Sequence, residues 1–221
     1  MDIPILYEDN HLLVVEKPVN IPVQGDKSGD QDLLTILKQD IKVRYNKPGN
    51  VYLGLVHRLD RPVGGVMVFA KTSKAASRLS DVIRRQALER HYLTVVRGKP
   101  KKKQAVLEHN LMKDTRKNIV HVVSAKDKRG KKAKLEYEVK KQANDLSLLS
   151  VKLHTGRPHQ IRVQLSEEGM PIYGDQKYGR HVNKPGQQIA LWAHKISFKH
   201  PTKDEIIEVK CPPPNEYPWK I

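Results

Sequence analysis

The sequence contains a single cysteine, Cys211, among 221 residues. One thiol cannot form an internal disulfide bond, and it cannot supply a zinc site built from several cysteines. The 10 histidines are scattered, and no H-E-x-x-H pattern accompanies His154 and His159. These absences predict no metal site, and they favour a protein of a reducing compartment, which we expect to be the cytoplasm.

Long apolar segments are also missing. The first apolar residues, Ile3 to Leu6, are followed almost at once by Glu8, Asp9 and Asn10. No later run approaches the roughly 20 apolar residues that span a bilayer. We therefore predict neither an apolar signal segment nor a membrane partner.

Acidic residues are few relative to basic ones: 24 Asp and Glu stand against 41 Lys and Arg, for a formal net charge of +17. Such an imbalance favours a polyanionic partner, and nucleic acid is the leading candidate. Basic residues gather at 97–103 and 126–132, which we expect to be exposed loops that contact phosphates. A solvated lysine-rich surface is the alternative for either stretch alone. Aromatic residues make up 5% of the chain, too few for an extensive base-stacking platform.

The hydrophobic pattern predicts a chain rich in strands. Short apolar runs between charged turns indicate strands at 11–16, 51–57, 64–71, 92–97, 134–139, 146–154 and 206–210. Helical spacing covers 32–41 and 73–90, and a third helix is expected from near Pro158 to before Gly169, with His159 and Arg162 on one face. The pattern predicts one α+β domain with a mixed or antiparallel sheet.

Two short segments carry the candidate chemistry. In His57-Arg58-Leu59-Asp60, an extended backbone would place Arg58 and Asp60 on the same side. Residues 156–162 supply two arginines, which can hold a carboxylate ionised or bind phosphate. Each segment alone is most often an ordinary ion pair or surface cation. A Pro/Gly turn and an apolar strand follow Asp60, however, and catalytic groups are common on such turns. We expect one active site for acid chemistry on a polyanion.

Taken in order along the chain, these and further segments resemble the RluA-type pseudouridine synthase family. The resemblance covers nearly the whole chain and rests on Glu16-Lys17-Pro18, Val56 to Asp60, Arg90 to Leu93, Thr155 to Arg162, Pro171 to Asp175, Tyr178-Gly179, Leu191 to His194 and His200-Pro201. It implies the pseudouridine synthase fold, with a mixed, largely antiparallel central sheet flanked by helices and an active-site cleft between two halves. Because the similarity starts within the first dozen residues, we expect 1–221 to be a single catalytic domain without a separate N-terminal RNA-binding module.

The resemblance implies isomerisation of uridine to pseudouridine in structured RNA, ribosomal or transfer, without a cofactor or metal. Asp60 falls on the catalytic aspartate, Arg162 on the arginine that pairs with it, and Tyr92 on the tyrosine that packs against the target base. Arg58 falls on the arginine associated with filling the place of the extruded base. Further substrate-binding residues are expected at His57, Arg157, His159 and Gln160.

These roles have a physical basis. A buried aspartate without a partner tends to take up a proton, so an arginine is needed to keep it ionised. Extruding a nucleotide costs a few kcal/mol, which contacts from Arg58 and Tyr92 can offset. The route stays open: Asp60 attacks the sugar, attacks the base, or removes a proton from the sugar. Gly64, where the family usually has serine, and Trp192, where histidine is frequent, depart from the pattern.

Other classes fit less well. A glycosidase needs two carboxylates around the bond, and the motifs supply one aspartate flanked by arginines. The main competitor is a non-catalytic RNA-binding or ribosome-assembly protein that keeps the synthase fold. The joint presence of Asp60, Tyr92 and Arg162 argues against it. We expect a monomer that requires no protein partner.

Overall fold

The computed structural model describes residues 2–221, which form two compact units. The first unit comprises the chain up to Glu89 together with Ala193–Pro212. The second comprises Arg90–Trp192 and Pro213–Ile221. Of the candidate residues, His57, Arg58 and Asp60 therefore belong to the first unit, and the others belong to the second.

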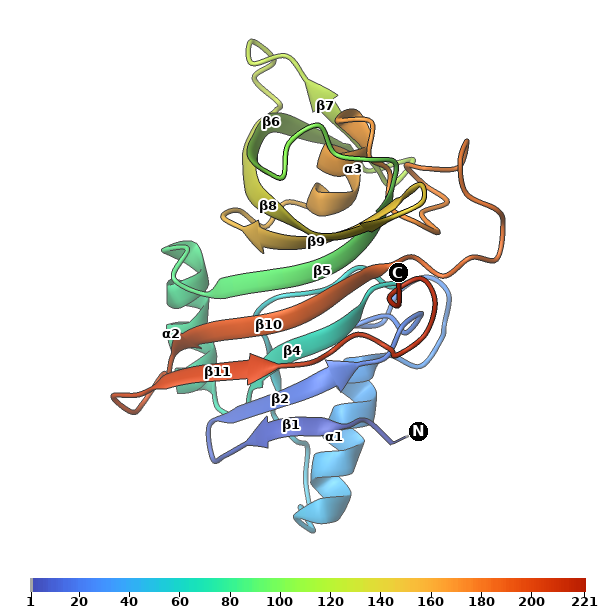
Figure 1. The fold of residues 1–221 in the computed structure, drawn as a ribbon. Coiled ribbons are helices and arrows are strands. Elements are labelled where there is room, and N and C mark those ends of the chain that lie inside the picture. Colours follow the sequence, from blue (N-terminus) through green and yellow to red (C-terminus); the bar gives the residue numbers. More distant parts are fainter. Residues whose placement is uncertain (1) are drawn as a thin grey trace. The chain divides into compact units, whose positions relative to one another are not determined.

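The first unit is a sheet with two helices (Figure 1). Its strand order is β1-β2-β4-β10, with β3 beside β4 and β11 antiparallel to β10. Figure 1 shows the two helices behind these strands. The bounds are β1 (Ile5–Glu8), β2 (Leu12–Lys17), α1 (Leu33–Arg44), β3 (Gly54–Leu55), β4 (Gly64–Ala70), α2 (Ser73–Arg84), β10 (Leu191–Lys199, in this unit from Ala193) and β11 (Ile206–Lys210).

The core of this unit lies along β2 and β4, which pair antiparallel. All seven residues of β4 are buried, and so are the four apolar residues that open β2. A strand buried on both faces reads as a continuous apolar run, which explains why 64–71 was predicted well. The buried strand β4 begins four residues after Asp60, so the candidate catalytic loop leads directly into the core.

Side-chain caps set where both helices begin. The Asp32 carboxylate accepts a hydrogen bond from the backbone N–H of Thr35, and the Thr72 hydroxyl accepts one from Ala75. The predicted helix at 73–90 was too long, because α2 ends at Arg84 and Gln86 takes a left-handed φ of 57°. Backbone of that hand cannot continue a right-handed helix.

The second unit is a curved antiparallel sheet in the order β5-β9-β8-β6-β7. Its helix α3 packs against β6 and β7 and lies within the curve of the strands in Figure 1. Six consecutive residues of this helix, 160–165, are buried. The bounds are β5 (Glu89–Arg97, in this unit from Arg90), β6 (Gln104–Asp114), β7 (Ile119–Val123), β8 (Lys131–Ala143), β9 (Leu146–Leu153) and α3 (Gln160–Glu167).

The α+β class with a largely antiparallel sheet is confirmed, but one local prediction was wrong. His159 was placed on the face of α3 that carries Arg162, yet it precedes the helix as its N-cap residue, with a left-handed φ of 52°. A residue of that backbone conformation is not part of the helix, so helical spacing does not place its side chain.

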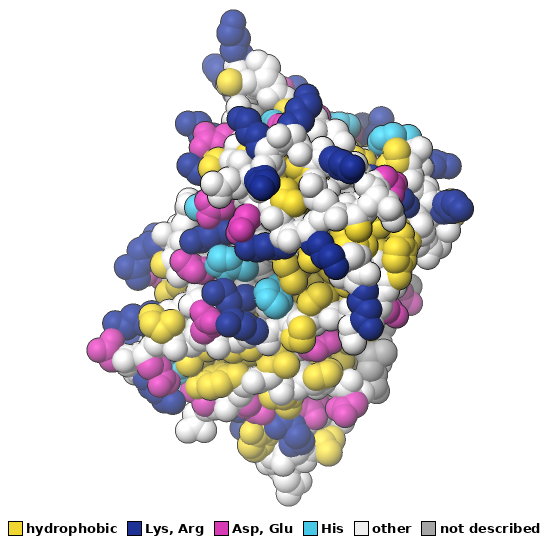
Figure 2. Space-filling view, in the orientation of Figure 1, with side chains coloured by type: hydrophobic (Ala, Val, Ile, Leu, Met, Phe, Trp, Pro, Cys, Tyr) yellow, Lys and Arg dark blue, Asp and Glu magenta, His cyan; other side chains and the backbone are white. Residues whose placement is uncertain are grey.

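Both basic stretches contain exposed residues in connections between strands. Lys99 and Lys101 to Lys103 lie between β5 and β6, and Lys126, Lys128 and Arg129 lie between β7 and β8. Figure 2 shows Lys and Arg side chains spread over the face of the molecule in view. None of the helices within residues 2–221 has the length and apolar character needed to cross a membrane.

Candidate active site

Asp60 opens a tight turn in the first unit. The backbone N–H of Val63 donates a hydrogen bond of 2.9 Å to the carbonyl oxygen of Asp60. Burial alternates before the turn, because Arg58 is exposed, Leu59 is buried and Asp60 is half-buried. This alternation agrees with the extended geometry expected for the motif. Asp60 is therefore presented on a short closed loop that leads into a buried strand.

The buried side chain of Lys17 supports this loop with hydrogen bonds. It is fully buried, and its ammonium donates to the carbonyl oxygens of Pro18 at 2.9 Å, Arg61 at 3.0 Å and Val63 at 2.7 Å. Burial lowers the pKa of Lys17 to about 7, and the charge of Asp60 acts in the opposite direction. Three donors on one ammonium match three carbonyls, two of them in the Asp60 turn. In the sequence, Lys17 is recognisable only as part of the family segment Glu16-Lys17-Pro18.

Gly65 allows close backbone contact behind the turn. Its φ is 114°, and a Cβ atom there would lie 2.3 Å from the carbonyl oxygen of Ala193. Only glycine adopts this conformation at such a distance without strain. Gly64, the residue that departs from the family pattern, directly precedes this close contact with β10.

The arginines beside Asp60 differ in their contacts. Arg61 donates to the carbonyl oxygen of Asn20 and to the Ser28 hydroxyl, and it pairs with Asp30, which ties the 20–30 segment to the turn. Arg58 is exposed and forms no ion pair with any residue from 2 to 221. His57 accepts a 3.1 Å hydrogen bond at Nε2 from the backbone of Val68. Arg58 is thus the cation of this motif that is available to a ligand.

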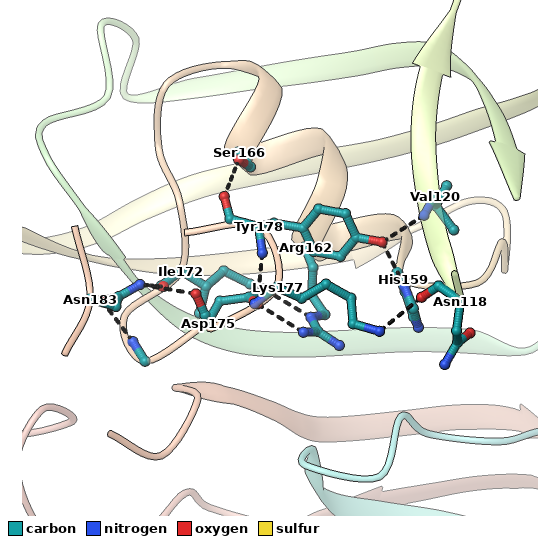
Figure 3. A network of polar contacts seen from close by, with 11 residues as sticks. Asn118, Val120, His159, Arg162, Ser166, Ile172, Asp175, Lys177, Tyr178 and Asn183 are labelled. Carbon is teal, nitrogen blue, oxygen red and sulfur yellow. Dashed lines mark hydrogen bonds and ion pairs between the residues drawn. The ribbon is translucent and has the colours of Figure 1, made fainter. Parts of the chain in front are cut away.

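In the second unit, Arg162 is bound by a carboxylate that the sequence analysis did not assign. Arg162 is 6% exposed, and its Nε and Nη2 atoms each lie 2.8 Å from an oxygen of Asp175 (Figure 3). Burial raises the pKa of Asp175, but the hydrogen bonds and charge of Arg162 outweigh it, so that the pKa lies below its usual value. The pairing of Arg162 with Asp60, which belongs to the other unit, stays a prediction.

Tyr178 covers the same guanidinium. The centre of its ring lies 5.3 Å from Cζ of Arg162, a cation–π distance. Its hydroxyl accepts a 2.8 Å hydrogen bond from the backbone of Val120 and lies 2.7 Å from Nδ1 of His159. Figure 3 shows these groups around Arg162. Asp175 and Tyr178 lie in two neighbouring segments that carry the family resemblance, but nothing in their spacing indicated these contacts.

Two of the remaining candidates of this unit, Arg157 and Gln160, make hydrogen bonds around the turn before α3. Gln160 is 3% exposed, and its Oε1 accepts from the Thr155 hydroxyl at 2.8 Å and from the backbone of Arg157 at 2.9 Å. Arg157 donates to the carbonyl oxygen of Lys132. Tyr92 is 7% exposed and lies near the start of β5. Contacts of these residues with a substrate stay predictions.

Comparisons with known proteins agree on one family. The family model described as RNA pseudouridylate synthase matches residues 11–167. An uncharacterized RNA pseudouridine synthase of Aquifex aeolicus is 35% identical over 95% of this chain and 70% of its own length. The ribosomal large subunit pseudouridine synthase C of Escherichia coli is 30% identical over 94% of this chain and 66% of its own length. This chain therefore spans about two thirds of the length of these relatives.

A solved structure shows the same fold. The chain described as human RNA pseudouridylate synthase domain containing 4 superposes with a TM-score of 0.80 at 22% sequence identity. The match covers 96% of this chain and 89% of that one. At this identity the likeness is evidence for the fold, and it confirms the fold expected from the sequence.

Proposed function

Because this chain belongs to the RNA pseudouridylate synthase family, we propose that it isomerises uridine to pseudouridine in RNA, with ribosomal RNA as the substrate. One observation carries the proposal: the family match at 11–167 includes Asp60, on a turn held by Lys17, as well as Tyr92 and Arg162. The choice of ribosomal RNA is supported by the names of relatives such as the Escherichia coli enzyme. Transfer RNA is the alternative substrate.

The reaction requires no outside oxidant or reductant. The bond between N1 of uracil and C1′ of the ribose breaks, and a bond between C5 and C1′ forms. C5 loses its proton and N1 carries one in the product, so atoms and electrons balance without a cofactor. We assign to Asp60 the central step, by attack on the sugar or the base or by removal of a proton from the sugar. A carboxylate on a closed turn is well suited to each route, because its position is set before the substrate binds.

Three further residues have roles in this proposal. Arg162 pairs with Asp60, and Tyr92 packs against the target base. Arg58 enters the place of the extruded base, which is supported by its exposure and by the absence of an ion-pair partner within residues 2–221. The net charge of +17 supports attraction of RNA to the protein. The buried thiol of Cys211, which is not part of a disulfide, supports a cytoplasmic location.

The test is pseudouridine mapping by mass spectrometry on ribosomal and transfer RNA from a strain that lacks the gene. Each RNA is incubated with wild-type protein or with Asp60→Asn, which keeps the shape of the side chain. We expect new pseudouridine at one or a few ribosomal positions with wild type and none with the variant, at similar RNA affinity. Turnover by the variant would remove Asp60 from its role. RNA binding by wild type without modification would favour the non-catalytic alternative.

A further inference from the structure

The surroundings of Arg162 extend beyond a single ion pair. Asp175 binds the guanidinium through Nε and Nη2, a two-point contact that fixes the plane of the group as well as its position. The Asp175 side chain has no exposed surface, and that of Arg162 is 7% exposed. Since a guanidinium has five N–H donors, this contact leaves three that do not point at Asp175.

Asp175 is itself held in place by the loop that follows it. Its Oδ1 accepts from the backbone N–H groups of Lys177 at 2.8 Å and Tyr178 at 3.1 Å, and its carbonyl oxygen accepts from Gly179 at 3.0 Å. A carboxylate bound in this way has little freedom to rotate. The loop therefore presents a fixed anion to Arg162 rather than a mobile surface charge.

Tyr178 packs on one face of the guanidinium. Its ring lies over Arg162, and its hydroxyl is anchored by the backbone of Val120 in β7 and by His159. The hydroxyl therefore has one partner in β7 and a second, 2.7 Å away, in the residue that precedes α3. The neighbouring Lys177 donates from Nζ to the carbonyl oxygen of Asn118 at 2.8 Å, which ties the loop to the turn before β7 (Figure 3).

From these contacts we propose that Asp175 and Tyr178 are positioning residues, which act together to hold the guanidinium of Arg162 in one orientation for the reaction. The proposal rests on the function proposed above for Arg162. Asp175 sets the plane of the group and balances its charge, and Tyr178 prevents the plane from tilting. Arg162 then meets its reaction partner as an oriented donor that need not reorganise during turnover.

The test measures steady-state turnover of an RNA substrate by Asp175→Asn and Tyr178→Phe, together with thermal unfolding. Displacement of a group that acts at the reaction centre by about 1 Å can cost about 100-fold in rate. We expect kcat to fall by roughly this factor in Asp175→Asn and by about 10-fold in Tyr178→Phe, which keeps the ring but loses its anchor. KM should change by less than about 3-fold, because the altered groups position Arg162 rather than bind RNA.

Matched controls separate positioning from folding. Tyr137→Phe removes a hydroxyl from another buried tyrosine of the same unit, and Asp9→Asn removes the negative charge that faces the buried His200. Both controls should keep the wild-type kcat. If kcat falls in proportion to the loss of thermal stability in the controls and in the test variants alike, the effect is structural and the proposal is wrong.

A second measurement keeps the proposal testable if Asp175→Asn folds poorly. Single-turnover rates are compared for Tyr178→Phe, Arg162→Lys and the double variant. If Tyr178 acts through Arg162, its substitution should change the rate of the Arg162→Lys protein by less than about 2-fold, because the planar group is already gone. If the rate loss in the double variant equals the product of the two single losses, Tyr178 does not act through Arg162 and the inference is wrong. A wild-type protein without turnover would overturn the proposed function instead.

Discussion

The ammonium of Lys17 lies 2.7 Å from the carbonyl oxygen of Val63, at the end of the turn that Asp60 begins. The contact joins residues that are 46 positions apart in the chain. It is one of three that the fully buried Lys17 makes with backbone carbonyls, so the geometry of the turn depends on a residue from another strand.

Replacement of Lys17 by methionine should loosen this turn. Methionine fills a similar volume but donates no hydrogen bond, and each buried carbonyl left without a donor costs about 1–3 kcal/mol. We expect the free energy of unfolding at pH 7 to fall by at least about 2 kcal/mol and turnover to fall between about 10-fold and 100-fold. Urea denaturation and a turnover assay on the same preparations measure both. Unchanged turnover at reduced stability would limit Lys17 to a structural role.

The same substitution should change how stability depends on pH. The pKa of Lys17 is about 7 in the folded protein, against a usual value of 10.5. Between these values the unfolded chain binds a proton that the folded protein does not, so this residue makes stability rise with pH. Relative to Lys17→Met, the wild-type protein should gain about 1.4 kcal/mol per pH unit within this window. Parallel pH profiles of the two proteins would contradict the low pKa.

Gly65→Ala should be strongly destabilising because its Cβ would overlap the backbone of Ala193. The backbone strain of a positive φ alone costs about 1–3 kcal/mol, and the clash adds to it. Gly29→Ala is a matched control, since its φ is 75° but no atom lies within 4 Å of the added Cβ. Thermal unfolding should show a clearly larger loss for Gly65→Ala. Equal losses would mean that β10 can move away from β4.

Arg58→Ala should separate catalysis from folding. Arg58 is exposed and has no ion-pair partner among residues 2–221, so its loss should change the free energy of unfolding by less than about 0.5 kcal/mol. If Arg58 takes the place of the extruded base, its loss leaves an extrusion cost of a few kcal/mol without compensation. Single-turnover rates should then fall by about 10-fold or more. A rate equal to that of wild type would exclude this role.

The basic loop at 101–103 should contribute to the salt dependence of RNA binding. No carboxylate of residues 2–221 pairs with its three exposed lysines, whereas Lys199, Lys203 and Lys210 pair with Asp204, Glu205 and Glu208. Replacing Lys101, Lys102 and Lys103 by glutamine should lower the slope of log affinity against log salt by roughly 2. The same change at the three paired lysines should have a smaller effect. An unaltered slope for the loop variant would exclude the loop from the RNA interface.

Local signals in the sequence predicted much of the fold. The strand at 206–210 was predicted with its observed bounds, and the helix predicted at 32–41 begins within one residue of α1, because apolar periodicity acts within a few positions of the chain. The strands β1, β6, β7 and β10 were missed. In β6, polar and charged residues separate the apolar positions, and Leu111 is buried in a cluster that includes Val120 of β7 and Val163 of α3.

The candidate site, too, could be predicted from the sequence only in part. The order of short recognisable segments was enough to match Asp60, Tyr92 and Arg162 to positions of one family, because each residue lies in such a segment. It could not show that Asp175 binds Arg162, that Tyr178 covers it, or that Lys17 supports the Asp60 turn. These contacts join residues from different elements, and periodicity or spacing describes only neighbours along one element. Tertiary structure decided them, because burial requires each charged or polar group to meet a partner wherever in the chain that partner lies.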